Sequence, residues 1–580
     1  MERYESPRQK NKGIVDTYFS RIYSLKSGDA FFLKTTLLVL CVFLILFLIQ
    51  LSQNNALTVA TSGGTFSEGV IGTPRFVNPV LAVTRADKDL TTLLYDGLMA
   101  LGKEGTLVPN IAESLTISED GLTYNIVLKE NVSFHDGVRL TSRDVASTVG
   151  RIQDPLLGSP LRANFDGVTV EEISDREINF ILPESYTPFI ENLTFGILPE
   201  HIWKDASSEE FPFSQNNSEP IGSGPYRVET IVRNASGIPE SYILKAYTEH
   251  HNGTPKIETV EFHFFPTEDK FVEAFKKGTI ESVVGVDAEL VQKLNINPET
   301  NHLERIPLPR TFAVFINQNK SPALRDTSAR EALSLVIDRN ALVLSSLKGY
   351  GNAITSPIPV GFGISMPPNV DTPKRLETAR DILRKGGWKP NPESHIWEKS
   401  IDGSVTPLSF SIATVNNSTF EATAEFLRTT WQTLGAEVSI KQFEQSDLIQ
   451  AIIRPRDYEA LLFGTQLGRS LDYYSFWHSS QRNDPGLNVA LYANITTDSI
   501  LSEMRRDTNR EGRADAIIRF AEEIKKENPA IFLYAPELLY VFPNRVQDAS
   551  FTGVEEPHER LSGIGEWYIE TESVWPFFTQ

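Results

Sequence analysis

Histidines, the single cysteine and paired carboxylates are the side chains through which this chain could do chemistry. The sequence holds nine His and one Cys in 580 residues. The histidines do not recur at the spacing of metal ligands, and His250 and His251 are adjacent, so on a strand they would point to opposite faces. His135, in the turn Phe134-His-Asp-Gly137, is expected to be satisfied by Asp136. We therefore expect no metal site.

Catalytic signatures are equally sparse. There is no GxxxxGK[ST] phosphate loop and no HExxH zinc motif. Gly222-Ser-Gly224 lacks the spacing of a GxSxG nucleophile elbow, and Gly349-Tyr-Gly351 is only half of a dinucleotide fingerprint. Acidic pairs such as Glu171-Glu172 are expected to lie on solvated faces. Glycosidase chemistry would need two carboxyl groups facing each other across a cleft, and the sequence does not show such a pair. The sequence predicts no catalytic residue and no cofactor.

An uncharged apolar block, residues 35–51, follows Lys34 directly, and the next charged residue is Glu68. Seventeen helical residues span about 26 Å, so we expect a single transmembrane anchor here. A cleaved signal peptide is the open alternative, but it would have a shorter apolar region and a small-x-small cleavage site. Cys41 lies inside the block with Leu40 before it, which favours a buried thiol over a lipid attachment site.

Charge sets the expected orientation of this anchor. Residues 1–34 carry seven Lys/Arg and four acidic residues, a net +3, and positive flanks stay in the cytoplasm. We expect a cytoplasmic leader over 1–34, an anchor over 35–51 and a body outside the cell. The whole chain carries −20, so the remainder carries about −23, which argues against a nucleic-acid partner. One Cys excludes a disulfide framework.

The pattern of predicted elements divides the body into two lobes. Short strands and turns dominate residues 57–305, with strands expected at 123–128 and 259–265 and an added subdomain at about 93–220. Strand–helix alternation over 306–529, with helices expected at about 326–346 and 420–434, indicates an α/β lobe. Residues 530–580 are expected to return to the first lobe. A discontinuous first lobe implies a hinged body, and a cleft between lobes is a favoured ligand site.

Several segments, taken together, resemble the family 5 extracellular solute-binding proteins, the peptide-binding components of ABC importers. Residues 118–137, SEDGLTYNIVLKENVSFHDG, resemble the family signature "S.DG..Y.F.LR.GV.FHDG". Gly222-Ser-Gly-Pro-Tyr226 matches "GTGPY". Arg330-Glu-Ala-Leu333 and Ile337-Asp-Arg339 match "R.AL..AIDR", and we expect Arg330 and Asp338 on one helix.

The resemblance implies an α/β, two-lobed, periplasmic-binding-protein-like fold of the large, type II peptide-binding class. It implies a monomeric binding protein, not an enzyme, that delivers a peptide or related small solute to an ABC permease. Two alternatives stay open: a ligand sensor or scaffold of the same fold acting on a membrane partner, and a surface hydrolase.

The resemblance also implies two ligand-binding stretches that offer main-chain groups to the ligand. The residues concerned are Val83, Thr84, Arg85, Gly464, Thr465, Gln466, Leu467, Arg469 and Asp472. Arg469 stands where peptide binders carry an Asp for the free amine of the peptide, and Arg favours a carboxylate or phosphate instead. Asp472 could take the amine, and a solvent-facing Arg469 is the other possibility.

Overall fold

The computed structural model describes residues 26–55, 57–361, 374–507 and 510–574. The chain divides into two compact units, Met1–Thr61 with Glu570–Gln580, and Ser62–Ile569, which we call the body. The described part of the first unit holds helix α2 (Ser27–Asn55) and an antiparallel pair formed by β1 (Leu57–Thr61) and β23 (Glu570–Val574). Residues 1–25 of the expected cytoplasmic leader lie outside the described residues.

Helix α2 contains the uncharged block of residues 35–51. Among the residues that the structure describes, no helix is long and apolar enough to cross a membrane. The expected transmembrane helix is therefore not supported.

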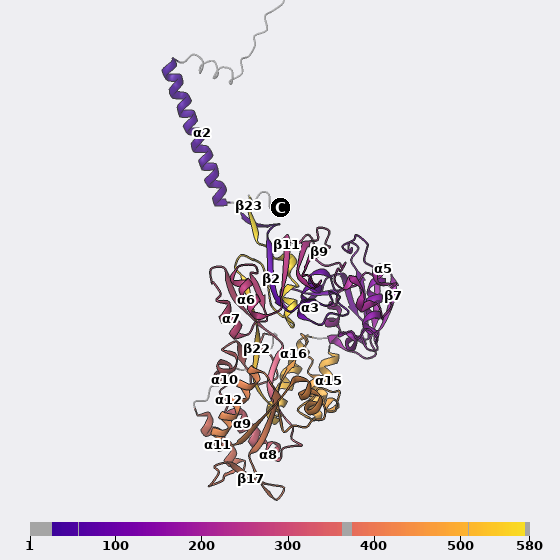
Figure 1. Ribbon diagram of the computed structural model, residues 1–580, viewed down its shortest axis with the longest axis vertical. Helices are drawn as coiled ribbons and strands as arrows, with labels where there is room; N and C mark the ends of the chain where they lie inside the picture. The colour runs from indigo at the N-terminus through magenta and orange to yellow at the C-terminus, as the bar shows by residue number, and fades with distance from the viewer. Residues whose placement is uncertain (1–25, 56, 362–373, 508–509, 575–580) are drawn as a thin grey trace, which may run out of the picture. The chain divides into compact units, whose positions relative to one another are not determined.

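A mixed twelve-stranded sheet runs through the body (Figure 1). Its strands, in order, are β20 (Glu437–Phe443), β19 (Ser409–Val415), β21 (Ala460–Gln466), β14 (Arg310–Ile316), β22 (Ala530–Pro543), β12 (Ser282–Val284), β2 (Thr65–Ile71), β11 (Thr259–Phe265), β10 (Pro239–Ala246) and β9 (Tyr226–Arg233). Strands β13 (Asn301–Pro307) and β15 (Gly351–Ala353) also pair with β22. The β19–β20, β19–β21, β2–β11 and β2–β12 pairs are parallel.

Strand β22 belongs to both lobes. Its first residues pair with β14 of the second lobe, and residues 537–543 pair with β13 of the first. The return to the first lobe was predicted to begin at residue 530. The first half of β22 still packs in the second lobe, because Ile531, Leu533 and Tyr534 lie in the core of that lobe. The two lobes share one strand, and residues 308–309 form the other nearby connection.

The first lobe combines half of this sheet with a subdomain. The subdomain sheet has the order β5 (Ala112–Ile117), β6 (Thr123–Leu128), β8 (Glu177–Ile181), β7 (Thr169–Ser174), and α4 (Ser142–Gln153) packs on β7. Strand β6 forms where the alternation of apolar residues predicts it, with Tyr124, Ile126 and Leu128 buried. Other elements are α3 (Arg85–Leu94), β3 (Met99–Leu101), β4 (Leu107–Pro109), the 3₁₀ helix η2 (Thr187–Thr194), α5 (Glu200–Trp203), α6 (Glu268–Lys276), α7 (Ala288–Leu294) and η7 (Pro557–Leu561).

The second lobe packs helices against the other half of the sheet, which buries two apolar clusters. The α-helices of this lobe, together with the π helix η5 (Leu448–Ile453), are α8 (Pro322–Arg325), α9 (Thr327–Leu335), α10 (Arg339–Leu347), α11 (Arg375–Lys385), α12 (Ser418–Leu434), α13 (Gln445–Asp447), α14 (Tyr474–Trp477), α15 (Ile495–Arg506) and α16 (Arg510–Glu527). A small sheet of β16 (Lys389–Pro390), β17 (Trp397–Ile401) and β18 (Ser404–Pro407) lies in this lobe.

The helix predicted over 326–346 is two helices, so the expectation that Arg330 and Asp338 share one helix is wrong. Asp338 is the N-cap of α10, because its side chain accepts from the Ala341 amide at 3.0 Å. Arg330 is buried in α9 and donates to main-chain carbonyls, including that of Glu527. Both residues stabilise helix ends.

Candidate functional site

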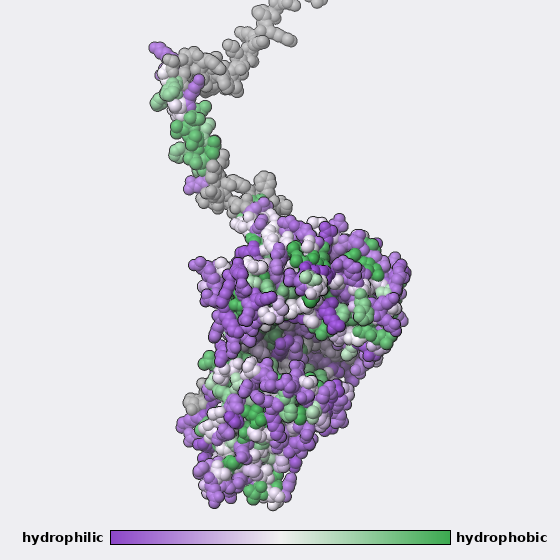
Figure 2. Space-filling view, in the orientation of Figure 1, coloured by the Kyte–Doolittle hydropathy of each residue, from purple (hydrophilic) through white to green (hydrophobic). Residues whose placement is uncertain are grey.

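The parallel strands of the second lobe end at a cavity of about 460 Å³. Because β20 and β21 both run parallel to β19, the carboxyl ends of all three strands meet at one edge of the sheet, the usual ligand position in such sheets. Figure 2 shows the body hollowed between the lobes. The cavity is lined by Arg310, Phe312, Val415, Asn416, Asn417, Phe420, Glu444, Gln445, Phe463, Gly464, Thr465 and Gln466.

Aromatic rings and the end of β21 form the wall of this cavity. The rings of Phe312 and Phe420 lie 5.4 Å apart, and Phe463 adds a third ring. A Cβ at Gly464 would come within 2.8 Å of the Phe312 ring, so only glycine lets β21 pass this close to it. Asn417, the N-cap of α12, lines the cavity beside these rings and adds a polar group to its edge. A pocket with an aromatic wall and polar groups around it suits a side chain of a small organic ligand.

The second predicted stretch is divided by the structure. Gly464, Thr465 and Gln466 line the cavity together. Leu467 does not, because its side chain is buried and its amide donates to the Pro309 carbonyl at 2.9 Å. Leu467 therefore fixes the end of β21 against the connection between the lobes.

Arg469 connects the lobes and does not face solvent. Its guanidinium lies 3.2 Å from Glu555 and 3.1 Å from Glu559, and it donates to the Gly553 carbonyl at 2.9 Å. Both glutamates belong to the segment that returns to the first lobe. Beside it, the Ser470 amide donates to Glu191 of η2. The positive charge of Arg469 is thus engaged by the chain's own carboxylates.

Three carboxyl groups, those of Glu191, Glu555 and Glu559, thus gather around one guanidinium. Burial raises the pKa of Glu191 to about 7, against the lowering effect of Arg469. Burial, together with Glu191 and Glu559, raises the pKa of Glu555 to about 9. Acids with raised pKa values bind more protons in the folded than in the unfolded chain, so their contribution to stability falls as the pH rises from about 4.5 to 9.

Asp472 has a partner of its own. Its carboxylate accepts from Arg505 Nη2 at 2.7 Å and from Nε at 3.0 Å, and the Tyr186 hydroxyl of the first lobe lies 3.4 Å away. The Arg505 guanidinium also stacks over the Tyr474 ring at 3.9 Å. A ligand amine would have to compete with Arg505 for this carboxylate.

The first predicted stretch lies at the start of α3. The Val83 side chain is 67% exposed, and Thr84 is the exposed N-cap, joined to Asp87 in a capping box. One turn later Lys88 pairs with Glu556 of the return segment. Val83 and Thr84 are therefore the accessible members of this stretch.

Arg85 instead borders a buried ion network. The Arg560 side chain is fully buried and binds Asp89 with two nitrogens, at 2.7 and 3.0 Å, and Glu68 with Nη2. Arg85 Nε lies 3.5 Å from Asp89, and the Tyr540 hydroxyl donates to Glu68 at 2.9 Å. This network ties β2, α3, β22 and the return segment into one lobe.

The histidine predictions need two corrections. The His135 ring binds the Gly222 amide and the Gly224 carbonyl, whereas Asp136 pairs with His201. Burial lowers the pKa of His135 to about 4, so it is a neutral packing residue. His250 and His251 do not point apart, because they lie in the loop between β10 and β11 rather than on a strand, and their rings are 4.4 Å apart.

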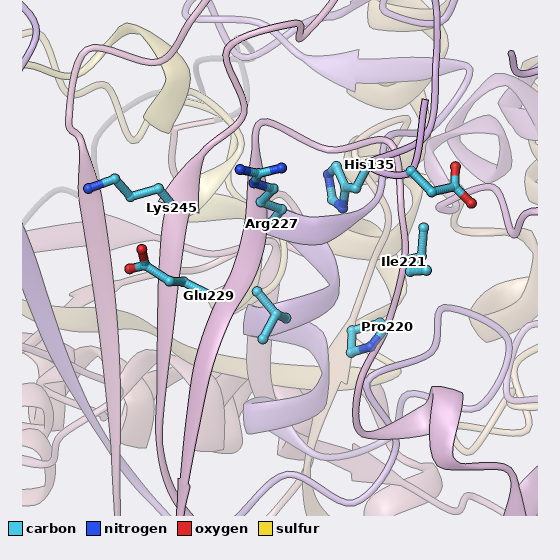
Figure 3. A pocket seen from close by; sticks show the side chains of 8 residues that line it. His135, Pro220, Ile221, Arg227, Glu229 and Lys245 are labelled. Carbon is cyan, nitrogen blue, oxygen red and sulfur yellow. The ribbon is translucent and has the colours of Figure 1, made fainter. Parts of the chain in front are cut away.

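A second pocket of about 420 Å³ borders His135 in the first lobe (Figure 3). Arg227, Glu229 and Lys245 project from β9 and β10, and Pro220 and Ile221 form the opposite side. These strands are antiparallel, and β9 is the edge strand of the large sheet, so the pocket lacks the converging strand ends of the first cavity. We treat it as a surface groove.

Sequence reasoning missed the aromatic wall and the acidic cluster. Asn416-Asn417 between a predicted strand and a predicted helix is the signal that could have located the cavity rim, since ligand-binding loops follow strand ends. Nothing local marks Glu191, Glu555 and Glu559, because they come together with Arg469 only in the folded chain.

Comparison with known proteins gives the family of this chain. Residues 106–486 match the sequence model described as bacterial extracellular solute-binding proteins, family 5 Middle. Oligopeptide-binding protein AppA of Bacillus subtilis is 27% identical over 531 residues, covering 87% of this chain and 92% of that protein. Glutathione-binding protein GsiB of Escherichia coli is 25% identical over 469 residues, covering 77% of this chain and 84% of GsiB.

Solved structures agree in fold. AppA of B. subtilis in complex with a nonapeptide aligns with a TM-score of 0.62 at 25% identity, covering 88% of this chain and all of that one. The unliganded open form of the periplasmic murein tripeptide binding protein MppA aligns with a TM-score of 0.74 at 17% identity, covering 89% of this chain and 99% of MppA. The expected mixed α/β, two-lobed fold is confirmed. This chain belongs to the bacterial extracellular solute-binding proteins of family 5, and it is a binding protein of an ABC transporter rather than an enzyme.

Proposed function

We propose that the body binds an oligopeptide between its two lobes, outside the cytoplasm, and delivers it unaltered to an ABC permease. The observation that carries this proposal is the cavity at the carboxyl ends of β19, β20 and β21, with Gly464–Gln466 in its wall. One relative supports the ligand class, since AppA is named for oligopeptides and its structure holds a nonapeptide.

The proposed mode of binding uses main chain for affinity and pockets for side chains. An extended peptide beside Gly464–Gln466 would pair with exposed main-chain groups, which contribute the same affinity whatever the peptide sequence. The ring wall of Phe312, Phe420 and Phe463 would accept an apolar side chain. Val83 and Thr84 would face the ligand from the first lobe. Arg469 and Asp472 would act in closing the lobes, since each already contacts the first lobe.

Closure of the lobes is the proposed signal to the permease. A ligand shifts the lobes toward the closed state by as much as it binds that state more tightly. The shared strand β22 and the connection at 308–309 are the segments about which the lobes would move. ATP hydrolysis would belong to separate subunits of the transporter.

Attachment to the outer face of a membrane through α2 is the remaining part of this proposal. The side chains of α2 from Leu37 to Phe47 are apolar apart from Cys41 and exposed, which favours lipid contact over water. In fractionated cells, we expect the full chain in the membrane pellet and a variant lacking residues 27–55 in the soluble fraction. Equal distribution of both chains would remove α2 as the attachment.

Peptide capture is tested with the purified full chain and an equimolar library of nonapeptides. We expect the chain to retain a subset of the peptides, recovered intact by mass spectrometry, and to be stabilised by about 2.7 kcal/mol at a hundredfold excess over Kd. Free amino acids at the same concentration serve as the control. Recovery of cleaved peptides would favour the hydrolase alternative, and equal stabilisation by amino acids would exclude an oligopeptide site.

A further inference from the structure

Two histidines and an aspartate of the first lobe converge away from the cavity just described. Asp96 follows α3, and His250 and His251 lie in the loop between β10 and β11. The ligand atoms of the three residues all lie within 4.8 Å of one another. The three side chains are 10%, 7% and 1% exposed, so the group is shielded from bulk water.

Both imidazoles aim a nitrogen at the same oxygen. His250 Nε2 lies 2.8 Å and His251 Nδ1 lies 3.5 Å from Asp96 Oδ2. A tetrahedral ion with arms of 2.0–2.1 Å separates neighbouring ligand atoms by about 3.3 Å. The two observed distances bracket that value, so an ion could enter with small side-chain movements.

Asn110 determines which nitrogen of His251 carries the hydrogen. Asn110 Nδ2 donates to Asp96 Oδ1 at 3.0 Å, and Asn110 Oδ1 accepts from Asn252 Nδ2 at 2.8 Å. Asn110 Oδ1 therefore also accepts from His251 Nε2, 3.2 Å away. In a neutral ring this leaves the Nδ1 lone pair facing the lone pairs of the Asp96 carboxylate.

Two lone pairs that face each other in a buried place repel unless a cation lies between them. The nearby cation, Lys129, donates to Asn252 Oδ1 at 2.9 Å and so turns its ammonium to the rim rather than to the carboxylate. A metal ion bound between the Nδ1 lone pair of His251 and the Asp96 carboxylate would remove this repulsion.

We propose that Asp96, His250 and His251 bind a divalent transition metal ion, best matched by Zn²⁺. Two imidazoles and one carboxylate are donors that Zn²⁺ accepts, and they leave a fourth position for water. Asn110 would not touch the ion but would hold His251 and Asp96 in position through its hydrogen bonds to both. The ion would join the end of α3 to the β10–β11 loop and so stabilise the first lobe.

The test uses the purified full chain after treatment with EDTA. Zn²⁺ affinity is measured by competition with a chromophoric chelator, and Co²⁺ serves as a spectroscopic probe of coordination. We expect one ion per chain, a rise in Tm on adding Zn²⁺, and intense tetrahedral Co²⁺ absorption bands. His251→Gln should weaken affinity by about 100-fold or more, and Asn110→Ala by about 10–100-fold.

His302→Gln is the matched control, because His302 is an exposed histidine paired with Glu304. It should bind Zn²⁺ as the unmodified chain does. Equal affinity of the unmodified chain and a His250→Gln/His251→Gln variant would overturn the proposal. So would the absence of one-to-one binding by the unmodified chain, a result that needs no variant to fold. Neither outcome bears on peptide capture, which is measured separately.

Discussion

Replacing Arg560 with Met is expected to lower the free energy of unfolding by about 3–5 kcal/mol, because it leaves two buried carboxylates without their main counter-charge. Arg560, Glu68 and Asp89 have fully buried side chains, and Met keeps most of the packing volume. Arg85 is a poor substitute, since its Nη2 lies 4.0 Å from Glu68 and its Nε 3.5 Å from Asp89, and neither nitrogen makes a hydrogen bond. Urea unfolding of the full chain, followed by circular dichroism, measures the loss.

Arg176→Met is the matched control. Arg176 also pairs with two carboxylates, Glu113 and Glu130, but those side chains are 58% and 75% exposed. Exposed pairs contribute about 0–1 kcal/mol, so the control should change stability by no more than that. Adding Asp89→Asn to Arg560→Met should restore part of the loss, because a neutral side chain is less costly to bury. Equal losses for the two arginine variants would show that burial of the network has no special effect.

Replacing Arg469 with Met is expected to weaken binding of every peptide by about 30-fold or more. Removing one partner of a desolvated ion pair costs roughly 2–5 kcal/mol, and here it leaves Glu191, Glu555 and Glu559 facing each other between the lobes. The closed state then becomes less populated, and apparent affinity falls with that population. Isothermal titration with a captured peptide and with its acidic and neutral analogues measures the effect.

The alternative role of Arg469 gives a different pattern. If Arg469 met a carboxylate of the ligand directly, only acidic peptides would lose affinity, by roughly tenfold. Glu555→Gln serves as the compensating variant, because it removes one of the carboxyl groups that Arg469→Met leaves without a cation, and it should restore part of the affinity of Arg469→Met. We also expect peptide affinity to fall between pH 6 and 9, as Glu191 and Glu555 ionise. Glu555→Gln should make this fall smaller. No change in affinity for any peptide would remove Arg469 from both roles.

Local pattern was enough to predict many elements of the fold. The strands expected at 123–128 and 259–265 form with those bounds, and the helix expected at 420–434 extends only two residues earlier. Each carries a regular alternation or helical period of apolar residues that any packed sheet or helix layer would bury. The helix expected over 326–346 failed where Asp338 starts a new helix, because a capping side chain can interrupt a favourable period.

The candidate site was only partly accessible to the same reasoning. Gly464–Gln466 was found through the family resemblance, and these residues do line the cavity. Phe312 and Phe420 were not, since aromatic residues at a strand start and a helix start read as ordinary core positions. His250 and His251 were assigned to a strand, whose alternation separates neighbours, whereas a loop lets both rings turn to one side.

The sequence by itself determined the family, the two-lobed α/β architecture and most of the elements, because these follow from periodicity and motifs in neighbouring residues. Only the tertiary structure decided which charges meet: Arg469 with Glu555 and Glu559, Arg560 with Glu68 and Asp89, and Asp96 with His250 and His251. The physical reason is that ionic contacts act through space at a few ångströms, whereas their partners are separated by up to 492 residues along the chain.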